Sequence, residues 1–591
     1  MQGLDARARA RSPFAAAFLS LVFPGLGHAY AGATNRALGF AAAPILLIAL
    51  LAGVVQRMDR VDLIGLVFNP FLLNSIFVVN IILLLYRLVA IIDAYRVTVW
   101  MNAAQAGGDG RLGNARLSRA PASIAGLLAI LLVMAGSHVV VARYDMLALD
   151  ALTSGCIFVG DDVKATCEGQ ADAPGAGASG SPGPEPSAVG SALPASAIPP
   201  WDGRERLNIL LIGADKQGGG HRTDTLITVS IDPITRKVAM FSLPRDTRNV
   251  PIPPGPARSA WGSVFSEKIN AFYLRNRERA DLWPGTDATR GYNGLKSVLG
   301  ELYELDIKYF VEVDFDGFKA VVDAVGGVTV NVQLPIVDDT YPAGIDRNLR
   351  LYIPSGIQHM NGTRALRYAR SRNTSSDFDR GARQQRILLS MRQQADPQTL
   401  IPRLPELVDA LKLAVKTDIP LDQLPNLLGL ATEVDTKDIR SYVFSPPFYQ
   451  EDVPTGYWTL PYPDRIRAAV RDAFTVDPEL AARREVLSGE GATIWVLNGT
   501  NAINRGSRLA GYLENEGLQA SAPRVQTAGA VPADTTIVAY NGAQTGLTAT
   551  IAYLESRFAV KVTTAADPAI RADVIITIGW NTPDLGPPPS S

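Results

Sequence analysis

"LNILLIGADKQGGGHRTDTLITVSID", residues 207–232, decides the fold class of this chain. It contains two short, apolar and β-branched runs on either side of a glycine-rich loop, which predicts two strands joined at one end. Alternating patterns of this kind continue to about residue 440. Further strands are expected at 237–244, 308–315 and 328–335, and helices at 292–305, 315–327, 362–372 and 379–394. Strands that alternate with helices predict an α/β/α sandwich around a central mixed sheet, in a domain spanning 204–440.

A second patterned segment lies at 489–583, after a connecting region at 441–488. "ATIWVLNGT" (492–500) predicts a strand that ends in an Asn-Gly turn, and "NRGSRLAGYLENEG" (504–517) predicts a helix that Gly517 ends. With the strand and helix patterns that follow, this segment predicts a small β/α domain. We interpret it as a binding or spacer domain rather than a second active site.

The first 142 residues have the composition of a multi-span helical membrane region. Three apolar segments, 38–55, about 66–92 and 122–142, are each near the roughly 20 residues that a spanning helix needs. Arginines precede the first segment and fill the loop before the last: Arg7, Arg9, Arg11, Arg96, Arg111, Arg116 and Arg119. The positive-inside rule then predicts three spans, a cytoplasmic N-terminus and an external chain after Arg143. The interrupted apolar stretch 13–31 is expected not to cross.

Two segments separate the membrane region from the sheet domain. Residues 143–168 hold the only cysteines, Cys156 and Cys167. In an oxidising compartment a disulfide is favoured over two free thiols, and a metal site is disfavoured because no histidine lies near them. Residues 169–203 are rich in Ala, Pro, Gly and Ser, which predicts a flexible or semi-extended tether.

The charge balance limits the kind of partner. The 591 residues include 56 Lys and Arg against 57 Asp and Glu, so the net charge is -1. No global polybasic surface of the kind that binds nucleic acid is present. Any anion site must be local, and the densest group of arginines lies between Arg364 and Arg386.

Two pairs of charged residues stand at predicted strand ends. Asp215 ends the first strand and Asp224 begins the second, so both carboxylates can supply oxygen ligands to a hard cation such as Mg²⁺. The alternative is that Asp215 caps a turn and Asp224 is a solvated strand residue. Arg245 and Asp246 in "SLPRDT" (242–247) follow the next strand, at an edge where α/β folds place ligands, although such a pair is also typical of a surface ion pair.

The arginine cluster spans two predicted helices. Arg370 and Arg372 diverge on helical spacing and serve one site only if the helix ends near them, as the following "NTSSD" predicts. Arg380 and Gln384 are four residues apart on the next helix and share a face. Convergent guanidinium groups favour a pyrophosphate over a lone carboxylate. A solvated basic helix face is the alternative.

The ordered motifs "GAD", "RTDT", "LPRDT", "KINAFY", "YARSR" and "DFDRGARQQ" resemble those of the LytR-CpsA-Psr family of cell-wall glycopolymer ligases, over about residues 205–395. The tail at 492–582 looks like the small domain often appended in that family. Two features depart from the family pattern: the chain has several predicted spans rather than one, and Asp379 stands where glycine is usual.

The resemblance implies a magnesium-assisted phosphotransferase that moves a glycopolymer from a polyprenyl-pyrophosphate carrier to a peptidoglycan hydroxyl. It implies that Asp215 and Asp224 hold the metal, and that the apolar carrier lies in a tunnel between sheet and helices. The residues that it assigns to the pyrophosphate are Arg222, Arg245, Arg370, Arg372, Arg380 and Gln384. The incoming hydroxyl could give its proton to Asp377 or to Asp246, and these alternatives stay open.

Other functions would use the same residues. A polyprenyl-pyrophosphate hydrolase would let water attack in place of a sugar hydroxyl, and a lipid-binding accessory protein would lack ligase activity. A nucleic-acid regulator is disfavoured because the predicted topology places the arginines outside the cell. We therefore expect a multi-pass membrane protein whose catalytic domain is extracytoplasmic and whose partners are a lipid-linked glycopolymer and peptidoglycan, with no nucleic acid.

Overall fold

The computed structural model describes two compact units, one made of Met1–Ser154 with Pro420–Thr432, the other of Gly155–Ile419 with Glu433–Ser591. The described residues are 10–58, 69–105, 121–153, 157–159, 201–216, 221–332, 335–344, 347–354, 356–371, 377–394, 412, 415–434, 439–446, 448–453, 456–475, 478–500, 505–523, 532–583 and 585. Cys156, Cys167, Arg372 and the segment 169–200 lie outside them, so the predictions that concern these residues stay predictions.

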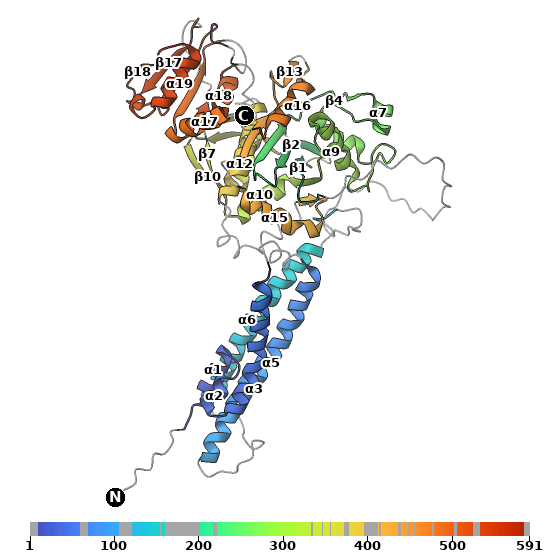
Figure 1. Ribbon diagram of the computed structural model, residues 1–591, viewed down its shortest axis with the longest axis vertical. Helices are drawn as coiled ribbons and strands as arrows, with labels where there is room; N and C mark the ends of the chain where they lie inside the picture. Colours follow the sequence, from blue (N-terminus) through green and yellow to red (C-terminus); the bar gives the residue numbers. More distant parts are fainter. Residues whose placement is uncertain are drawn as a thin grey trace, which may run out of the picture. The chain divides into compact units, whose positions relative to one another are not determined.

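The first unit is helical (Figure 1). Its helices are α1 (Pro13–Val22), α2 (Leu26–Ala31), α3 (Thr34–Val55), α5 (Pro70–Gln105), α6 (Pro121–Thr153) and most of α15 (Leu424–Glu433). Of these, α3, α5 and α6 are long and apolar enough to cross a membrane. The stretch 13–31 instead forms two short helices, because Pro24 and Gly25, which has a φ of 99°, break it. Three apolar helices were predicted, and three are present among the described residues.

The second unit contains a mixed six-stranded sheet in the order β11-β6-β1-β2-β3-β12. Its strands are β1 (Leu207–Asp215), β2 (Arg222–Ile231), β3 (Val238–Leu243), β6 (Tyr309–Asp314), β11 (Val415–Thr417) and β12 (Ile439–Val443). β1 runs parallel to β6 and β3 parallel to β12, whereas the other neighbours are antiparallel. The prediction of a central mixed sheet is confirmed.

Helices α9 (Arg290–Tyr303) and α12 (Asp377–Gln394) cover opposite faces of this sheet (Figure 1). Successive side chains of a strand point to opposite faces. Phe241 of β3 belongs to the core cluster that contains the leucines of α9, whereas the next residue, Ser242, accepts a hydrogen bond of 2.8 Å from Gln385 Nε2 of α12. The two faces are thus closed by different helices.

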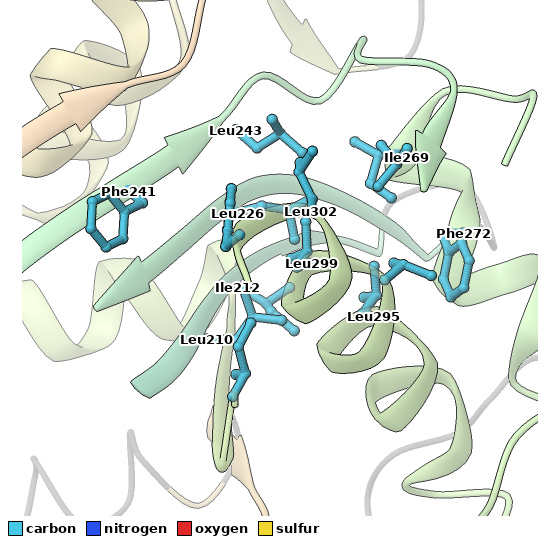
Figure 2. Packing of buried hydrophobic residues seen from close by; sticks show 14 of the residues in the cluster. Leu210, Ile212, Leu226, Phe241, Leu243, Ile269, Phe272, Leu295, Leu299 and Leu302 are labelled. Carbon is cyan, nitrogen blue, oxygen red and sulfur yellow. The ribbon is translucent and has the colours of Figure 1, made fainter. Parts of the chain in front are cut away.

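The core on the α9 side follows from the spacing of its leucines. Leu295, Leu299 and Leu302 recur at intervals of four and three, so they form one helical face. Figure 2 shows this face against Leu210 and Ile212 of the sheet, and all five side chains are fully buried or nearly so.

A separate cluster forms around α10 (Phe315–Ala324) and α11 (Gly362–Arg370), with Val322, Ala365 and Tyr368 among its members. α9 and α10 therefore contribute to different clusters, and the lipid tunnel that the family resemblance implies stays a prediction.

Several short strands and helices were not predicted from the sequence. β8 (Ile336–Gly344) and β9 (Arg347–Ile353) form a hairpin whose register shifts interrupt the alternation, and β13 (Gln450–Val453) and β14 (Trp458–Pro461) have only four residues each. The remaining elements of this domain are β4 (Val250–Pro251), α7 (Pro256–Trp261), β5 (Val264–Phe265), η3 (Ile269–Ala271), α8 (Phe272–Asn276), β7 (Val328–Val332), β10 (Gly356–Met360) and α16 (Pro463–Asp472), whereas η5 (Leu421–Gln423) belongs to the first unit.

The C-terminal part has a sheet of its own, in the order β16-β15-β19-β17-β18. Its elements are α17 (Pro478–Glu490), β15 (Thr493–Asn498), α18 (Arg505–Asn515), β16 (Gln519–Ser521), β17 (Thr536–Tyr540), η7 (Ala543–Thr545), α19 (Thr548–Phe558), β18 (Thr563–Ala565) and β19 (Val574–Ile578). Ile494, Leu513 and Val574 are fully buried in its core cluster. Gly517 follows α18 with a φ of 94°, as its role in ending that helix requires.

Candidate functional site

The strand ends of β1 and β2 form the centre of the site, and a β-bulge shapes it. Gly213 pairs with Thr225 and Ala214 pairs with Thr223, so Asp224 is the extra residue between two normal pairs. Bulges re-aim side chains and are common beside active sites. Gly213 is required here, because a Cβ at this position would lie 2.9 Å from Cβ of Thr225.

Asp224 binds the arginine of the next motif. Arg245, just beyond the end of β3, donates a hydrogen bond from Nη1 to Asp224 Oδ2. The other carboxylate oxygen, Oδ1, is buried and has no hydrogen-bond partner among the described residues. A buried carboxylate oxygen without a partner is costly, so this atom is positioned for a cation or a donor that binds from outside.

Asp246 is held by two cations. Lys268 Nζ donates to its Oδ1 at 2.7 Å, and Arg245 Nε lies 3.8 Å from its Oδ2. The residue is 8% exposed. Lys268 belongs to the "KINAFY" motif, so this contact joins two of the motifs that the sequence singled out.

Asp215 is paired with an arginine from a distant helix. Arg370 Nη2 lies 3.6 Å from Asp215 Oδ2, and the Arg370 guanidinium stacks at 3.9 Å on the ring of Phe315. Arg370 is the last residue of α11, so the predicted helix end near the arginines is confirmed. Burial raises the pKa of the neighbouring Tyr341, although the charge of Arg370 opposes that shift.

The other predicted residues occupy more varied positions. Arg222 is exposed and faces Asp215 in the β1–β2 register. Arg380 is 6% exposed, whereas Gln384 is half-buried and its neighbour Gln385 is the residue that contacts the sheet. Arg372 and the side chain of Asp377 lie outside the described residues, so their assigned roles stay predictions.

A buried carboxylate that the sequence analysis did not assign lies beside these residues. Glu312 of β6 is fully buried and accepts hydrogen bonds from Tyr292 Oη at 2.8 Å and from His221 Nε2 at 2.7 Å. Lys216 Nζ lies 3.2 Å from its other oxygen. Alternation in "YFVEVD" predicts an inward-facing charge at this position, which is the signal that could have found it.

The pKa values of this group follow from opposed effects. Burial would raise the pKa of Glu312, but the hydrogen bond and charge of His221 and the charge of Lys216 outweigh it and lower that pKa. Burial also opposes protonation of Lys216, yet Glu312 and Asp314 raise the pKa of its amine. Glu312 is therefore ionised at neutral pH.

The described residues contain no group of three or more His, Cys, Asp or Glu side chains that could hold a metal alone. Asp215 and Asp224 nevertheless fit Mg²⁺, which typically binds one or two carboxylates and completes its shell with water and substrate phosphates. The buried Oδ1 of Asp224, which no described residue engages in a hydrogen bond, supports this fit.

Comparisons with known proteins match the same region. The model of the LytR_cpsA_psr family matches residues 185–459. Polyisoprenyl-teichoic acid–peptidoglycan teichoic acid transferase TagV of Bacillus subtilis (strain 168) is 31% identical over 226 residues, which are 37% of this chain and 51% of TagV. Polyisoprenyl-teichoic acid–peptidoglycan teichoic acid transferase TagU of Oceanobacillus iheyensis is 30% identical over 247 residues, which are 40% of this chain and 68% of TagU.

Two further similarities are weaker. Regulatory protein MsrR of Staphylococcus aureus (strain COL) is 29% identical over 259 residues, or 42% of this chain and 68% of MsrR. The crystal structure of B. subtilis TagV aligns with a TM-score of 0.35 at 26% identity, over 46% of this chain and 97% of that one. The chain thus spans about half the length of the first of these relatives.

Proposed function

The chain belongs to the LytR-CpsA-Psr family, and on that premise we propose that it transfers a glycopolymer from a polyprenyl-pyrophosphate carrier to a hydroxyl of peptidoglycan. TagV and TagU are named as polyisoprenyl-teichoic acid–peptidoglycan teichoic acid transferases, which supports this class of donor and acceptor. The name of MsrR denotes a regulator, but the near-neutral charge of this chain gives no support to nucleic-acid binding.

One observation carries the proposal. Each of the two carboxylates assigned to the metal is paired with an arginine assigned to the pyrophosphate: Asp215 with Arg370, and Asp224 with Arg245. The partners come from four separate motifs, 155 residues apart for the first pair and 21 for the second. Alternating carboxylates and guanidinium groups suit a metal-bound pyrophosphate better than a lone anion, because each charge type has its counterpart in the ligand.

The two pairs differ in how far apart their members lie in the sequence: Arg370 and Asp215 are distant, whereas Arg245 and Asp224 are close. The Asp215–Arg370 pair forms only when α11 is assembled on the sheet, so this part of the site depends on the folded domain.

The proposed chemistry needs charge neutralisation more than covalent catalysis. Mg²⁺, bound by Asp215 and Asp224, would neutralise charge on the pyrophosphate oxygens. Arg245 and Arg370 would hold those oxygens and stabilise the charge that collects on the departing polyprenyl phosphate. Lys268 holds the Asp246 carboxylate beside Arg245, which helps to keep that guanidinium in place.

The direct test is transfer by the purified full-length chain. With Mg²⁺, a labelled polyprenyl-pyrophosphate glycopolymer and peptidoglycan, we expect label covalently bound to peptidoglycan together with stoichiometric polyprenyl phosphate. Release of glycopolymer phosphate into solution, with none attached to peptidoglycan, would instead identify a hydrolase. Binding of the lipid with neither product would identify an accessory protein.

The proposed orientation gives a separate prediction. Because the arginine-rich segments flank an even number of crossings, the N-terminus is expected to be cytoplasmic and residues from Trp201 onward external. In a cysteine-free background, a cysteine at position 180 should react in intact cells with an impermeant thiol reagent, and one at position 110 only after lysis. The reverse pattern would contradict this orientation.

A further inference from the structure

The buried Glu312 and the imidazole of His221 have the geometry of a general-base pair. Nε2 of His221 lies 2.7 Å from Glu312 Oε2. The ring also stacks on Tyr273, with centroids 4.1 Å apart, so the carboxylate and the aromatic ring together fix its orientation. A base oriented in this way by a buried carboxylate is the arrangement that activates hydroxyl nucleophiles.

The second nitrogen of this imidazole is open. With Nε2 engaged by Glu312, Nδ1 of His221 makes no hydrogen bond to any residue that the structure describes. Nδ1 is not among the enclosed polar atoms without a partner, and the side chain is 12% exposed. A substrate hydroxyl can therefore approach Nδ1 while Nε2 stays bound.

The pair also lies at the strand ends that form the site. His221 precedes Arg222, which faces Asp215 across the β1–β2 ladder. Lys216, which follows Asp215, binds the same Glu312 carboxylate. His221 and Lys216 are therefore the chain neighbours of Arg222 and Asp215, and both bind the same buried carboxylate.

We propose that His221 is the catalytic base that accepts the proton of the incoming peptidoglycan hydroxyl, with Glu312 as its positioning residue. This rests on the proposed transfer function. The hydroxyl oxygen forms a bond to the glycopolymer-side phosphorus while its proton passes to Nδ1. The bond from that phosphorus to the bridging oxygen breaks, and its electron pair leaves with polyprenyl phosphate. The imidazolium is stabilised by Glu312 and returns its proton to solvent.

Of the two residues that the sequence offered for this role, Asp246 is already engaged by two cations. Its Oδ1 lies 2.7 Å from Lys268 Nζ and its Oδ2 lies 3.8 Å from Arg245 Nε, so both oxygens already face cations of the protein. Asp377, the other alternative, has a side chain outside the described residues, so its role stays a prediction. Glu312 itself is fully enclosed, so it can orient a base but cannot meet a polymer hydroxyl.

The test combines steady-state kinetics with chemical rescue, on the purified full-length chain in the transfer assay above. His221→Ala should lower kcat about 10²–10⁴-fold and leave KM for the lipid-linked donor within about twofold, because a base acts in the transition state and does not hold the donor. Added imidazole should restore at least a tenth of the lost rate. A residue that only supports the loop would not respond to imidazole.

Two further variants complete the design. His359→Ala removes an exposed histidine of β10 whose Nδ1 lies 3.1 Å from Thr329 Oγ1, and it should keep the wild-type kcat with no response to imidazole. Glu312→Gln keeps the shape of the side chain but not its charge, and should lower kcat without rescue, because the imidazole is still present. Melting temperatures of all variants show whether each chain is folded.

The outcomes separate the two proposals. Transfer by the wild-type chain together with an unchanged kcat in His221→Ala would overturn the base assignment and leave the function standing. A folded His221→Ala chain that loses activity without imidazole rescue would make His221 structural and also overturn the assignment. No transfer by the wild-type chain would overturn the proposed function, and the base role with it.

Discussion

Arg370→Ala is expected to lower glycopolymer transfer about 10²–10³-fold while the chain stays folded. The guanidinium of Arg370 bridges Asp215 and the ring of Phe315, so its donors are aimed at the strand ends where the pyrophosphate is proposed to bind. Charge builds up on the departing phosphate as its bond breaks, and an arginine at that point stabilises the transition state more than the ground state. The measurement is kcat in the transfer assay, with a melting temperature for each variant.

Two other substitutions act as controls for that result. Arg370→Lys keeps a positive charge but loses the planar fork, so it should recover only part of the activity. Arg364→Ala removes an arginine from the first turn of the same helix, where its Nη2 lies 3.4 Å from Gln358 Oε1, and should be nearly silent. Equal activities for Arg364→Ala and Arg370→Ala would mean that α11 presents a general basic face rather than a binding site.

The fold was largely predictable because its strands and helices have strong periodicity. "LNILLIG" and "KVAMFSLP" contain runs of β-branched and apolar residues long enough to be found without tertiary information, and α9 has leucines at helical spacing. The β13–β14 hairpin was not predicted, because strands of only four residues are too short to show a clear alternation of apolar and polar residues. Its place beside the site depends instead on tertiary contacts, such as the hydrogen bond from Arg248 N to Thr459 O at 2.9 Å.

The candidate site was predictable only as a set of residues. The sequence singled out Asp215, Asp224, Arg245 and Arg370, but it could not show that they form two alternating pairs, since pairing is set by the bulge at Asp224 and by the place where α11 ends. His221 and Glu312 are 91 residues apart, the first just before β2 and the second within β6. Nothing local in either segment indicates the other, which is why this contact appears only in the folded chain.

The second large effect is expected at the bulge itself. Asp224→Asn keeps the shape of the side chain and an acceptor for Arg245, but it removes the negative charge from Oδ1, the oxygen without a hydrogen-bond partner among the described residues. If that oxygen binds Mg²⁺, transfer should fall about 10²–10³-fold at low Mg²⁺, and part of the loss should be recovered at high Mg²⁺, because only the affinity of the site for the cation is weakened. Transfer rates across a Mg²⁺ titration measure both effects, and chelation by EDTA should abolish wild-type transfer.

Asp316→Asn is the matched control for this substitution. Asp316 lies in the first turn of α10, its side chain is 89% exposed, and its partner is Lys319 at 2.6 Å. Solvent and salt screen such a surface pair, so the Asp316→Asn chain should need no more Mg²⁺ than the wild type and should melt at nearly the same temperature. A Mg²⁺ requirement that is equally unchanged in Asp224→Asn would remove Asp224 from the metal site. Its pairing with Arg245 would then serve only to orient that guanidinium toward the pyrophosphate, and the rate lost at low Mg²⁺ would not return as the cation concentration rises.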